Sequence, residues 1–213
     1  MGPSPSALRW QPLLRSLLLC LGLVAVAAHA GDQRYEPLAA SVQASLHAAV
    51  SDRAVQEPEF SSIKEKYEWY NEMSQRLERY IEDRRARFEF LKAARYEAQR
   101  AGLDPQLVLG LIEVESGFRK HVISRAGAQG YMQVMPFWVK LIGNSDSNLF
   151  HLRTNLRFGC TILRHYLDIE NGNLFRALGR YNGSLGRAAY PNKVRAAWER
   201  RWSWRPRIVQ ARR

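Results

Sequence analysis

Apolar residues recur every three or four positions along most of the chain, which is the period of an amphipathic helix. The segment "YEPLAASVQASLHAAVSDRAVQ" predicts a first helix, and Pro58 marks a break after it. Ser61 or Ser62 can cap a second helix with one buried face. The apolar stripe of that helix consists of Ile63, Tyr67, Tyr70, Met73, Leu77 and Ile81. Strand signals are scarce, so the pattern predicts an all-α protein.

The stripe falters at "EDRRAR", where Arg84 and Arg87 occupy positions that should be apolar. This predicts a helix boundary or kink near Asp83. Apolar periodicity then resumes at Phe88, Leu91, Ala94 and Ala98. Aromatic residues at helical spacing favour core packing, or contact with a partner helix, over ligand binding. We therefore expect residues 31–99 to form a helical region that packs on the domain after it.

The next helix has clear start and stop signals. Asp104 suits the N-cap, Pro105 the first helical position, and Gly117 a left-handed C-cap after "QLVLGLIEVES". This segment is apolar nearly all round, which predicts a buried helix.

Two amphipathic helices follow a polar segment, in "TNLRFGCTILRHYLDIE" and "NLFRALGRYNG", with a turn at Asn171–Asn173 between them. A last short helix is expected after Pro191. Cys160 lies in an apolar helical pattern without a metal-ligand cluster around it, so we expect a buried small residue rather than a nucleophile.

The first thirty residues differ from the rest. Arg9 and Arg15 precede an apolar run of about 13 residues, shorter than the roughly 20 that span a bilayer. The run ends in "AHA", with small residues at both cleavage positions. Residues 1–30 therefore predict a secretory signal peptide cut after Ala30, and a periplasmic location. An uncleaved N-terminal membrane anchor is the alternative; Leu19 before Cys20 disfavours a lipoprotein.

The formal net charge is +12, and residues 1–30 carry two arginines and no acid, so cleavage would leave +10. The remaining chain would hold one cysteine, which excludes a disulfide framework. A basic exported protein is expected to meet an anionic envelope polymer or lipid headgroups rather than nucleic acid. Residues 201–213 interleave arginine with tryptophan and could contact such a polymer or an anionic membrane, the alternative being a frayed, solvated tail.

Candidate chemistry lies in "EVESGFRKHVISRAGAQGYMQVMP". Glu113 and Glu115 are about 200° apart around a helix, so one is expected to be exposed and the other to face a cleft. Apolar neighbours and a helix C-terminus both raise a carboxyl pKa, as a general acid requires. The alternative is that Glu115 bonds a backbone amide or an arginine. The segment from Ser116 to Ser145 contains no Asp or Glu.

Four separated patches resemble the family 1 soluble lytic transglycosylase (SLT) domain, whose fold is that of goose-type lysozyme. They are "ESGF" with Ser124 after it, "GAQGYMQVMP", "NLRFG" with Asn155 and Gly159, and "YNGS" at Tyr181. The resemblance implies a lysozyme-like all-α catalytic domain over residues 100–200, preceded by additional helices. It implies no cofactor and no metal.

Carried over to this chain, the resemblance makes Glu115 the only catalytic acid and base. It places Ser124 and Gln133 in the sugar site and Met135 beside the glutamate. Tyr181 and Asn182 match the pair that holds the reacting sugar and the glutamate.

The chain also departs from the family pattern. Tyr131 replaces a leucine, and Phe137 and Trp138 replace smaller residues after the "QVMP" motif. Trp138 could stack on a sugar, but core packing is the more economical interpretation. Arg180 and Ser184 alter the edges of the "YNG" motif.

The implied function is cleavage of the β-1,4 bond between N-acetylmuramic acid and N-acetylglucosamine in peptidoglycan glycan strands, without water, to give 1,6-anhydro ends. Most glycosidases need two carboxylates at the scissile bond. One rival is a hydrolytic muramidase on the same fold, with Asp146 or Asp168 positioning water. The other is a wall-binding or envelope-assembly factor without turnover, acting with envelope machinery.

Overall fold

The computed structural model describes residues 33–51, 57–144 and 146–206, and the predicted signal peptide lies outside them. Within these ranges the regular structure is helical, with only isolated β-bridges in the loop before residue 135, so the all-α prediction is confirmed. The elements are α1 (Ala40–Ser51), α2 (Ile63–Leu77), α3 (Arg84–Arg100), α4 (Pro105–Ser116), α5 (Pro136–Ile142), α6 (Leu152–Ile169), α7 (Leu174–Asn182), α8 (Ala189–Ala197) and a π-helical turn η1 (Trp198–Trp202).

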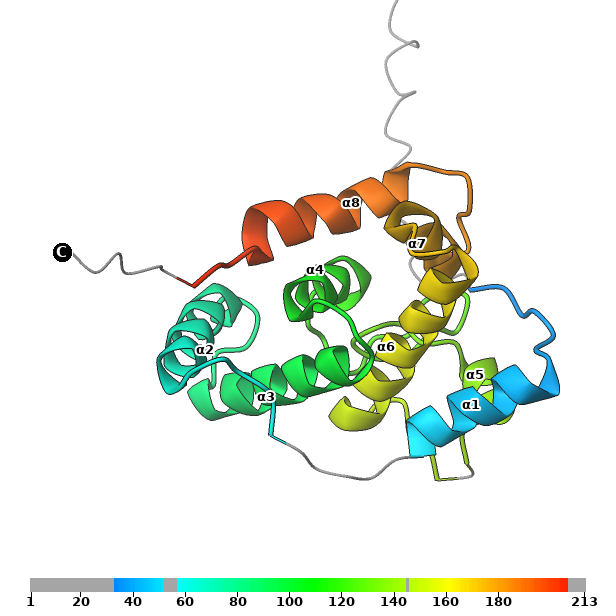
Figure 1. The fold of residues 1–213 in the computed structure, drawn as a ribbon, viewed down its shortest axis with the longest axis horizontal. Helices are drawn as coiled ribbons and strands as arrows, with labels where there is room; N and C mark the ends of the chain where they lie inside the picture. The colour runs from blue at the N-terminus through cyan, green and yellow to red at the C-terminus, as the bar shows by residue number, and fades with distance from the viewer. Residues whose placement is uncertain (1–32, 52–56, 145, 207–213) are drawn as a thin grey trace, which may run out of the picture.

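Helix α4 lies in the middle of the molecule, between α8 on one side and α3 on the other (Figure 1). It begins and ends where the sequence predicts. The Asp104 side chain accepts a hydrogen bond from the amide of Gln106, Pro105 occupies the first turn, and Gly117 ends the helix at φ 57° and ψ 40°. That left-handed conformation suits glycine because it has no Cβ. Residues 107 to 112 are all buried, as expected for an apolar central helix.

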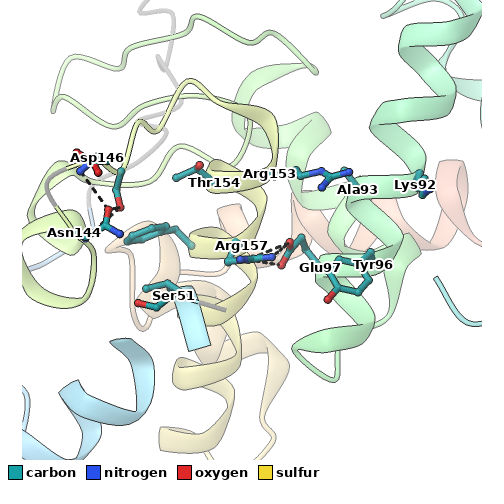
Figure 2. A pocket seen from close by; sticks show the side chains of 13 residues that line it. Ser51, Lys92, Ala93, Tyr96, Glu97, Asn144, Asp146, Arg153, Thr154 and Arg157 are labelled. Atoms are coloured by element: carbon teal, nitrogen blue, oxygen red, sulfur yellow. Dashed lines mark hydrogen bonds and ion pairs between the residues drawn. The ribbon is translucent and has the colours of Figure 1, made fainter. Parts of the chain in front are cut away.

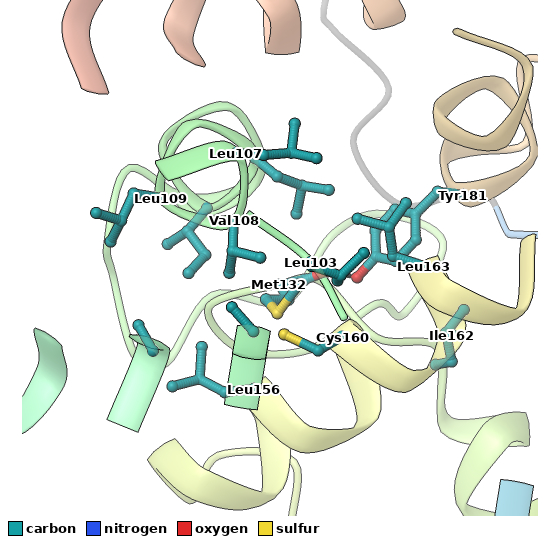
Figure 3. Packing of buried hydrophobic residues seen from close by; sticks show 14 of the residues in the cluster. Leu103, Leu107, Val108, Leu109, Met132, Leu156, Cys160, Ile162, Leu163 and Tyr181 are labelled. Atoms are coloured by element: carbon teal, nitrogen blue, oxygen red, sulfur yellow. Dashed lines mark hydrogen bonds between the residues drawn. The ribbon is translucent and has the colours of Figure 1, made fainter. Parts of the chain in front are cut away.

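The core between α4, α6 and α7 is filled by interdigitating aliphatic, sulfur and aromatic side chains (Figure 3). Met132 and Cys160 lie side by side at its centre, with Val108 above them and Leu156 below. The Cys160 thiol is fully buried, and burial raises its pKa well above the usual value. The prediction of a buried cysteine in the core is therefore confirmed.

The buried face of α2 is rotated from the predicted one. Ser62 caps the helix as expected, and Tyr70, Met73 and Leu77 are buried. However, Ile63 is 76% and Tyr67 is 72% exposed, and Trp69 is fully buried in their place. Position 67 lies about 120° around the helix from the buried position 73, so it points away from the core. The sequence pattern allowed both choices, and contact with α3 and η1 decided between them.

The break between α2 and α3 falls at Asp83, as predicted. Asp83 caps α3 by accepting from the amide of Ala86. Arg87, at a position expected to be apolar, is buried: its guanidinium donates to the carbonyl oxygens of Ile81 and Glu82 just beyond α2. A charged side chain can be buried there because these carbonyls replace its water.

The C-terminal helix starts earlier and extends further than the sequence suggested. Helix α8 begins at Ala189, so Pro191 lies in its first turn, where its missing amide breaks no helical hydrogen bond. The chain continues into η1, whose Trp202 is fully buried against Phe118. The start of the predicted basic tail is therefore packed, and Trp202 is not available to a membrane surface.

Glu113 also differs from its prediction. Its side chain is only 13% exposed and accepts hydrogen bonds from Tyr80 (2.7 Å), Trp202 (2.6 Å) and Arg201 (2.8 Å). Burial raises its pKa, but the hydrogen bonds from Arg201, Tyr80 and Trp202 outweigh it and lower the pKa overall. Glu113 therefore connects α4 to η1 and to the segment after α2.

Replacing Glu113 by alanine should lower the free energy of unfolding by about 2 kcal/mol, because the half-buried hydroxyl of Tyr80 and the buried indole of Trp202 lose their acceptor. Urea denaturation at neutral pH measures this. Glu199→Ala is the matched control: Glu199 forms an exposed pair with Arg195, and its loss should change stability by less than about 0.5 kcal/mol. Equal effects of the two substitutions would contradict the role given to Glu113.

Candidate active site

Glu115 lies in the last turn of α4 and is only 5% exposed. One carboxyl oxygen, Oε1, accepts a hydrogen bond from the hydroxyl of Tyr190 in the first turn of α8. The other oxygen, Oε2, is buried without a hydrogen-bond partner among the described residues. A buried carboxyl with one free oxygen needs an explanation, because such groups are rare in folded proteins.

The surroundings of Glu115 favour the neutral acid. Burial raises its pKa to about 8, and the hydrogen bond from Tyr190 only partly opposes this rise. The position at the C-terminal end of α4 adds to the effect, because the helix dipole disfavours negative charge there. Glu115 therefore carries its proton at neutral pH, as a general acid requires.

The chain leaves α4 by a tight turn that opens the loop over residues 117 to 135. Gly117 is followed by Phe118, which also has a positive φ of 61°. An aromatic residue rarely adopts this conformation, and here it is held by burial against Tyr80, Phe90 and Trp202. The turn directs the loop back across the end of α4.

Two side chains fix the loop at Met132. Asn155 of α6 accepts from the Met132 amide at 2.7 Å, and Tyr181 of α7 donates to the Met132 carbonyl at 2.8 Å. Asn155 also donates to the carbonyls of Gln129 and Leu149. Two helices thus hold one residue of the loop by both of its backbone groups.

The predicted site residues divide into buried and accessible ones. Gln133 is fully buried with φ 48°, and its amide donates to the carbonyls of Gly130 and Val122. Tyr181 is fully buried as well, and burial together with the charge of Glu115 raises its pKa. Both therefore support the loop, and Tyr181 is also close enough to Glu115 to feel its charge.

The other three candidates are placed differently. Ser124 is half-buried, and its hydroxyl accepts from the amide of Ala128 within the loop. Met135 is half-buried before α5, and Asn182 is nearly buried at the end of α7. Contacts of these residues with a sugar stay a prediction.

Trp138 packs in the core. It is buried, and its indole nitrogen donates to Gln33 at 2.9 Å. Core packing was the interpretation favoured from the sequence, and the structure confirms it.

Tyr190 is the residue that the sequence analysis missed. It stands alone in "RAAYPNKV", without a motif that marks it as part of a site. Only the packing of α8 against α4 brings its hydroxyl to Glu115, 75 positions earlier in the chain. Burial and the nearby Glu115 raise the pKa of Tyr190 well above the usual value, so it donates the shared proton.

A separate pocket of about 270 Å³ lies between α3 and the first turns of α6 (Figure 2). None of the predicted site residues lines it. Across it, Arg157 reaches Glu97 and forms a two-pronged ion pair, with 2.9 Å between Nη2 and Oε1. We interpret this pair as a connection between the two helices.

Over the described ranges, no three His, Cys, Asp or Glu side chains are grouped so that they could hold a metal ion. A search of the same residues finds no helix with the length and apolar character of a membrane span.

Comparison with known proteins identifies the family of the chain. The transglycosylase SLT domain model matches residues 92–201, more than half of the chain, and the chain therefore belongs to this family. A transglycosylase of Enterobacteria phage PRD1 is 35% identical over 99 residues, which cover 43% of this chain and 36% of the phage protein.

The membrane-bound lytic murein transglycosylase C of Haemophilus influenzae is 36% identical over 114 residues, covering 46% of this chain and 32% of that protein. The chain thus matches about a third of the length of both relatives. The chain also aligns with an X-ray structure of an inactive mutant of lytic transglycosylase Slt from Pseudomonas aeruginosa. The aligned sequences are 28% identical and the TM-score is 0.41, and the alignment covers 56% of this chain and 19% of that one.

The raised pKa of Glu115 predicts a pH-dependent stability difference. The folded protein keeps the proton up to about pH 8, whereas the unfolded chain releases it near 4.5, so rising pH destabilises the fold in this interval. Glu115→Gln removes this titration. The variant should be more stable than the wild type at pH 9, by at most about 5 kcal/mol, and nearly equal to it at pH 4.

Thermal unfolding of both proteins at pH 4, 6, 8 and 9 measures the difference. A stability difference that does not change with pH would show that Glu115 titrates normally. Glu199→Gln serves as a control, since Glu199 is exposed in its pair with Arg195.

Proposed function

We propose that this protein is an exported lytic transglycosylase that cleaves peptidoglycan glycan strands with Glu115 as its only catalytic carboxyl. The observation that carries the proposal is the environment of Glu115. Its carboxyl is buried and protonated at neutral pH, Tyr190 binds one oxygen, and the other oxygen has no hydrogen-bond partner in the described part of the chain. Membership of the SLT domain family supports the same substrate class.

The proposed reaction begins with proton transfer from Glu115 to the glycosidic oxygen between N-acetylmuramic acid and N-acetylglucosamine. The bond from the anomeric carbon to that oxygen breaks as the carbonyl oxygen of the 2-acetamido group attacks the anomeric carbon. The Glu115 carboxylate then removes the proton from the 6-hydroxyl of the same sugar. Oxygen 6 bonds to the anomeric carbon and displaces the acetamido oxygen, which leaves a 1,6-anhydro ring and Glu115 protonated again.

These two reaction steps require opposite protonation states of the same carboxyl group. The acid must be protonated before cleavage, which burial provides, and the carboxylate must be tolerated between the two steps, which the hydrogen bond from Tyr190 provides. Tyr190 lowers the pKa and so limits the effect of burial. Oε2 would be the oxygen that gives and takes the proton, because Oε1 is already bound.

The positions of the other carboxylates favour this reaction over hydrolysis. Asp146 borders the pocket between α3 and α6, and Asp168 forms an exposed ion pair with Arg164. Glu113 is held on another face of α4 by Arg201. The causes of the raised pKa of Glu115 are burial and Tyr190, and no neighbouring acid is among them. A water-activating carboxylate is therefore not at hand in the described residues.

A wall-binding factor without turnover is the less economical alternative. Burying a carboxyl with an unpartnered oxygen destabilises the fold, and binding alone does not require it. In the proposed enzyme, Ser124 and Met135 contact the sugar, while Gln133, Tyr181 and Asn182 shape the loop and the wall behind Glu115. Export is part of the proposal and is supported by the sequence of residues 1–30.

Glu115→Gln should abolish cleavage of purified peptidoglycan, with a loss of at least about 1,000-fold, because the amide cannot donate the required proton. Mass analysis of released muropeptides measures this, and wild-type products should be lighter by one water than hydrolytic products. Glu113→Gln is the matched control on the same helix: its folded fraction should keep the cleavage rate. Residual activity of Glu115→Gln, or reducing ends in the wild-type products, would refute the proposal.

The pH dependence of the wild-type enzyme gives an independent check. The initial rate should stay level between about pH 5.5 and 7 and fall as the pH rises through about 8, since only protonated Glu115 starts the reaction. Turbidity loss of peptidoglycan at constant ionic strength measures the rate. Tyr190→Phe should move the alkaline fall to higher pH, because it removes the hydrogen bond that lowers the Glu115 pKa. A fall centred near pH 5 would contradict the assigned acid.

A further inference from the structure

A groove of about 560 Å³ lies between α2 and α3, in the part of the chain that mostly precedes the family match. These two helices form one end of the molecule, opposite α1 and α5 (Figure 1). Aromatic rings of Tyr67, Tyr70 and Phe88 line the groove together with Leu91. Glu115 and the loop over residues 117 to 135 are not part of it.

Two of these rings are open to solvent. Tyr67 is 72% and Phe88 is 44% exposed, and the Phe88 ring stacks at a tilt on Tyr70, with 4.8 Å between centroids. Exposed aromatic rings gathered in one groove are typical of binding surfaces. The C–H bonds on one face of a pyranose ring form a flat apolar surface that fits an aromatic ring of this size.

The ring of Tyr70 lies beneath the more exposed ring of Phe88. Tyr70 is more than nine-tenths buried, so it is held in place by the packing around it. Its hydroxyl is covered by protein, so the rings, and not this hydroxyl, form the surface that a ligand can meet.

The rim supplies further groups for hydroxyls, amides and carboxylates. Asn71 and Gln75 are exposed along α2, one turn apart on the groove side, and the exposed Arg84 stands at its end. Planar amides that both donate and accept are well suited to sugar hydroxyls and acetamido groups. Arg84 adds a cation for the carboxylates that peptidoglycan carries on its peptide stems.

We propose that this groove is a second saccharide site, which binds an N-acetylated glycan strand of the wall away from Glu115. The inference rests on the proposed function for its substrate class. A saccharide fits better than a partner helix because the lining combines aromatic rings with amides and charged side chains. A docked amphipathic helix instead places an apolar face in a hydrophobic groove. The exposed aliphatic residue of α2, Ile63, is not among the lining residues.

The test measures binding of the full chain to insoluble peptidoglycan by sedimentation, with Glu115→Gln present so that the wall is not digested. Tyr67→Ala combined with Phe88→Ala should weaken binding about tenfold, as expected when two stacking rings are lost. Ile63→Ala is the matched control, since it removes an equally exposed apolar side chain outside the groove. Unchanged binding in the double variant, or equal weakening by Ile63→Ala, would overturn the proposal.

Cleavage assays separate this inference from the proposed function. With Glu115 intact, the Tyr67 and Phe88 substitutions should slow digestion of insoluble wall but leave the rate on a soluble peptidoglycan tetrasaccharide unchanged, because so short a glycan does not need the second site. A wild-type protein that cleaves neither substrate would refute the proposed function. The sedimentation result would still show whether the groove binds the wall, since that assay is carried out without turnover.

Discussion

The crossing of α4 by the C-terminal segment is the contact on which the rest of the structure depends. The backbone of Trp198, at the junction of α8 and η1, comes so close to Gly110 that a Cβ at that position would lie 2.8 Å from the Trp198 nitrogen. The indole of Trp198 also donates to Asp104, the residue that caps α4. Because of this approach, α8 delivers Tyr190 to Glu115, and η1 delivers Arg201 and Trp202 to Glu113.

The same contact gives two glutamates of one helix opposite properties. Glu113 receives donors from three side chains, so its pKa is lowered and it remains a charged structural group. Glu115 receives one neutral donor inside a dry environment, so its pKa is raised to about 8. Pairs of carboxyls whose surroundings push their pKa values apart are a recurrent way to separate acid chemistry from structural charge. Here a separation of two residues is enough to give Glu113 and Glu115 different surroundings, because the two side chains point to different faces of α4.

In the region before the family match, some side chains of α2 are buried in the core and others face solvent. Trp69, Met73 and Leu77 of α2 are fully buried and join it to α3 and η1, while Tyr67 on the same helix points outward beside Phe88. The buried Arg87 stabilises the junction of the two helices through the last carbonyls after α2. A helical pair that served only as packing would not need an exposed aromatic groove. The second saccharide site would give this pair a function that the catalytic domain lacks.

The sequence by itself determined the helical class and the boundaries of α4. These features depend on local rules: the cap at Asp104, the left-handed Gly117 and the apolar periodicity. The 200° separation of Glu113 from Glu115 predicted only that the two face different sides of α4, and the family resemblance pointed to Glu115 as the acid. The motif around "GYMQVMP" located the loop, and Asn155 and Tyr181 do hold it.

Only the tertiary structure decided which face of α2 is buried, because Ile63 and Tyr67 satisfy the same periodicity as Tyr70 and Met73. Only the packing of α8 on α4 made Tyr190 the partner of Glu115, and only contact with η1 and Tyr80 turned Glu113 from an exposed bystander into a largely covered connection. The physical reason is the same in each case. Burial and hydrogen bonding are properties of the neighbours that a residue acquires on folding, and those neighbours are distant in sequence.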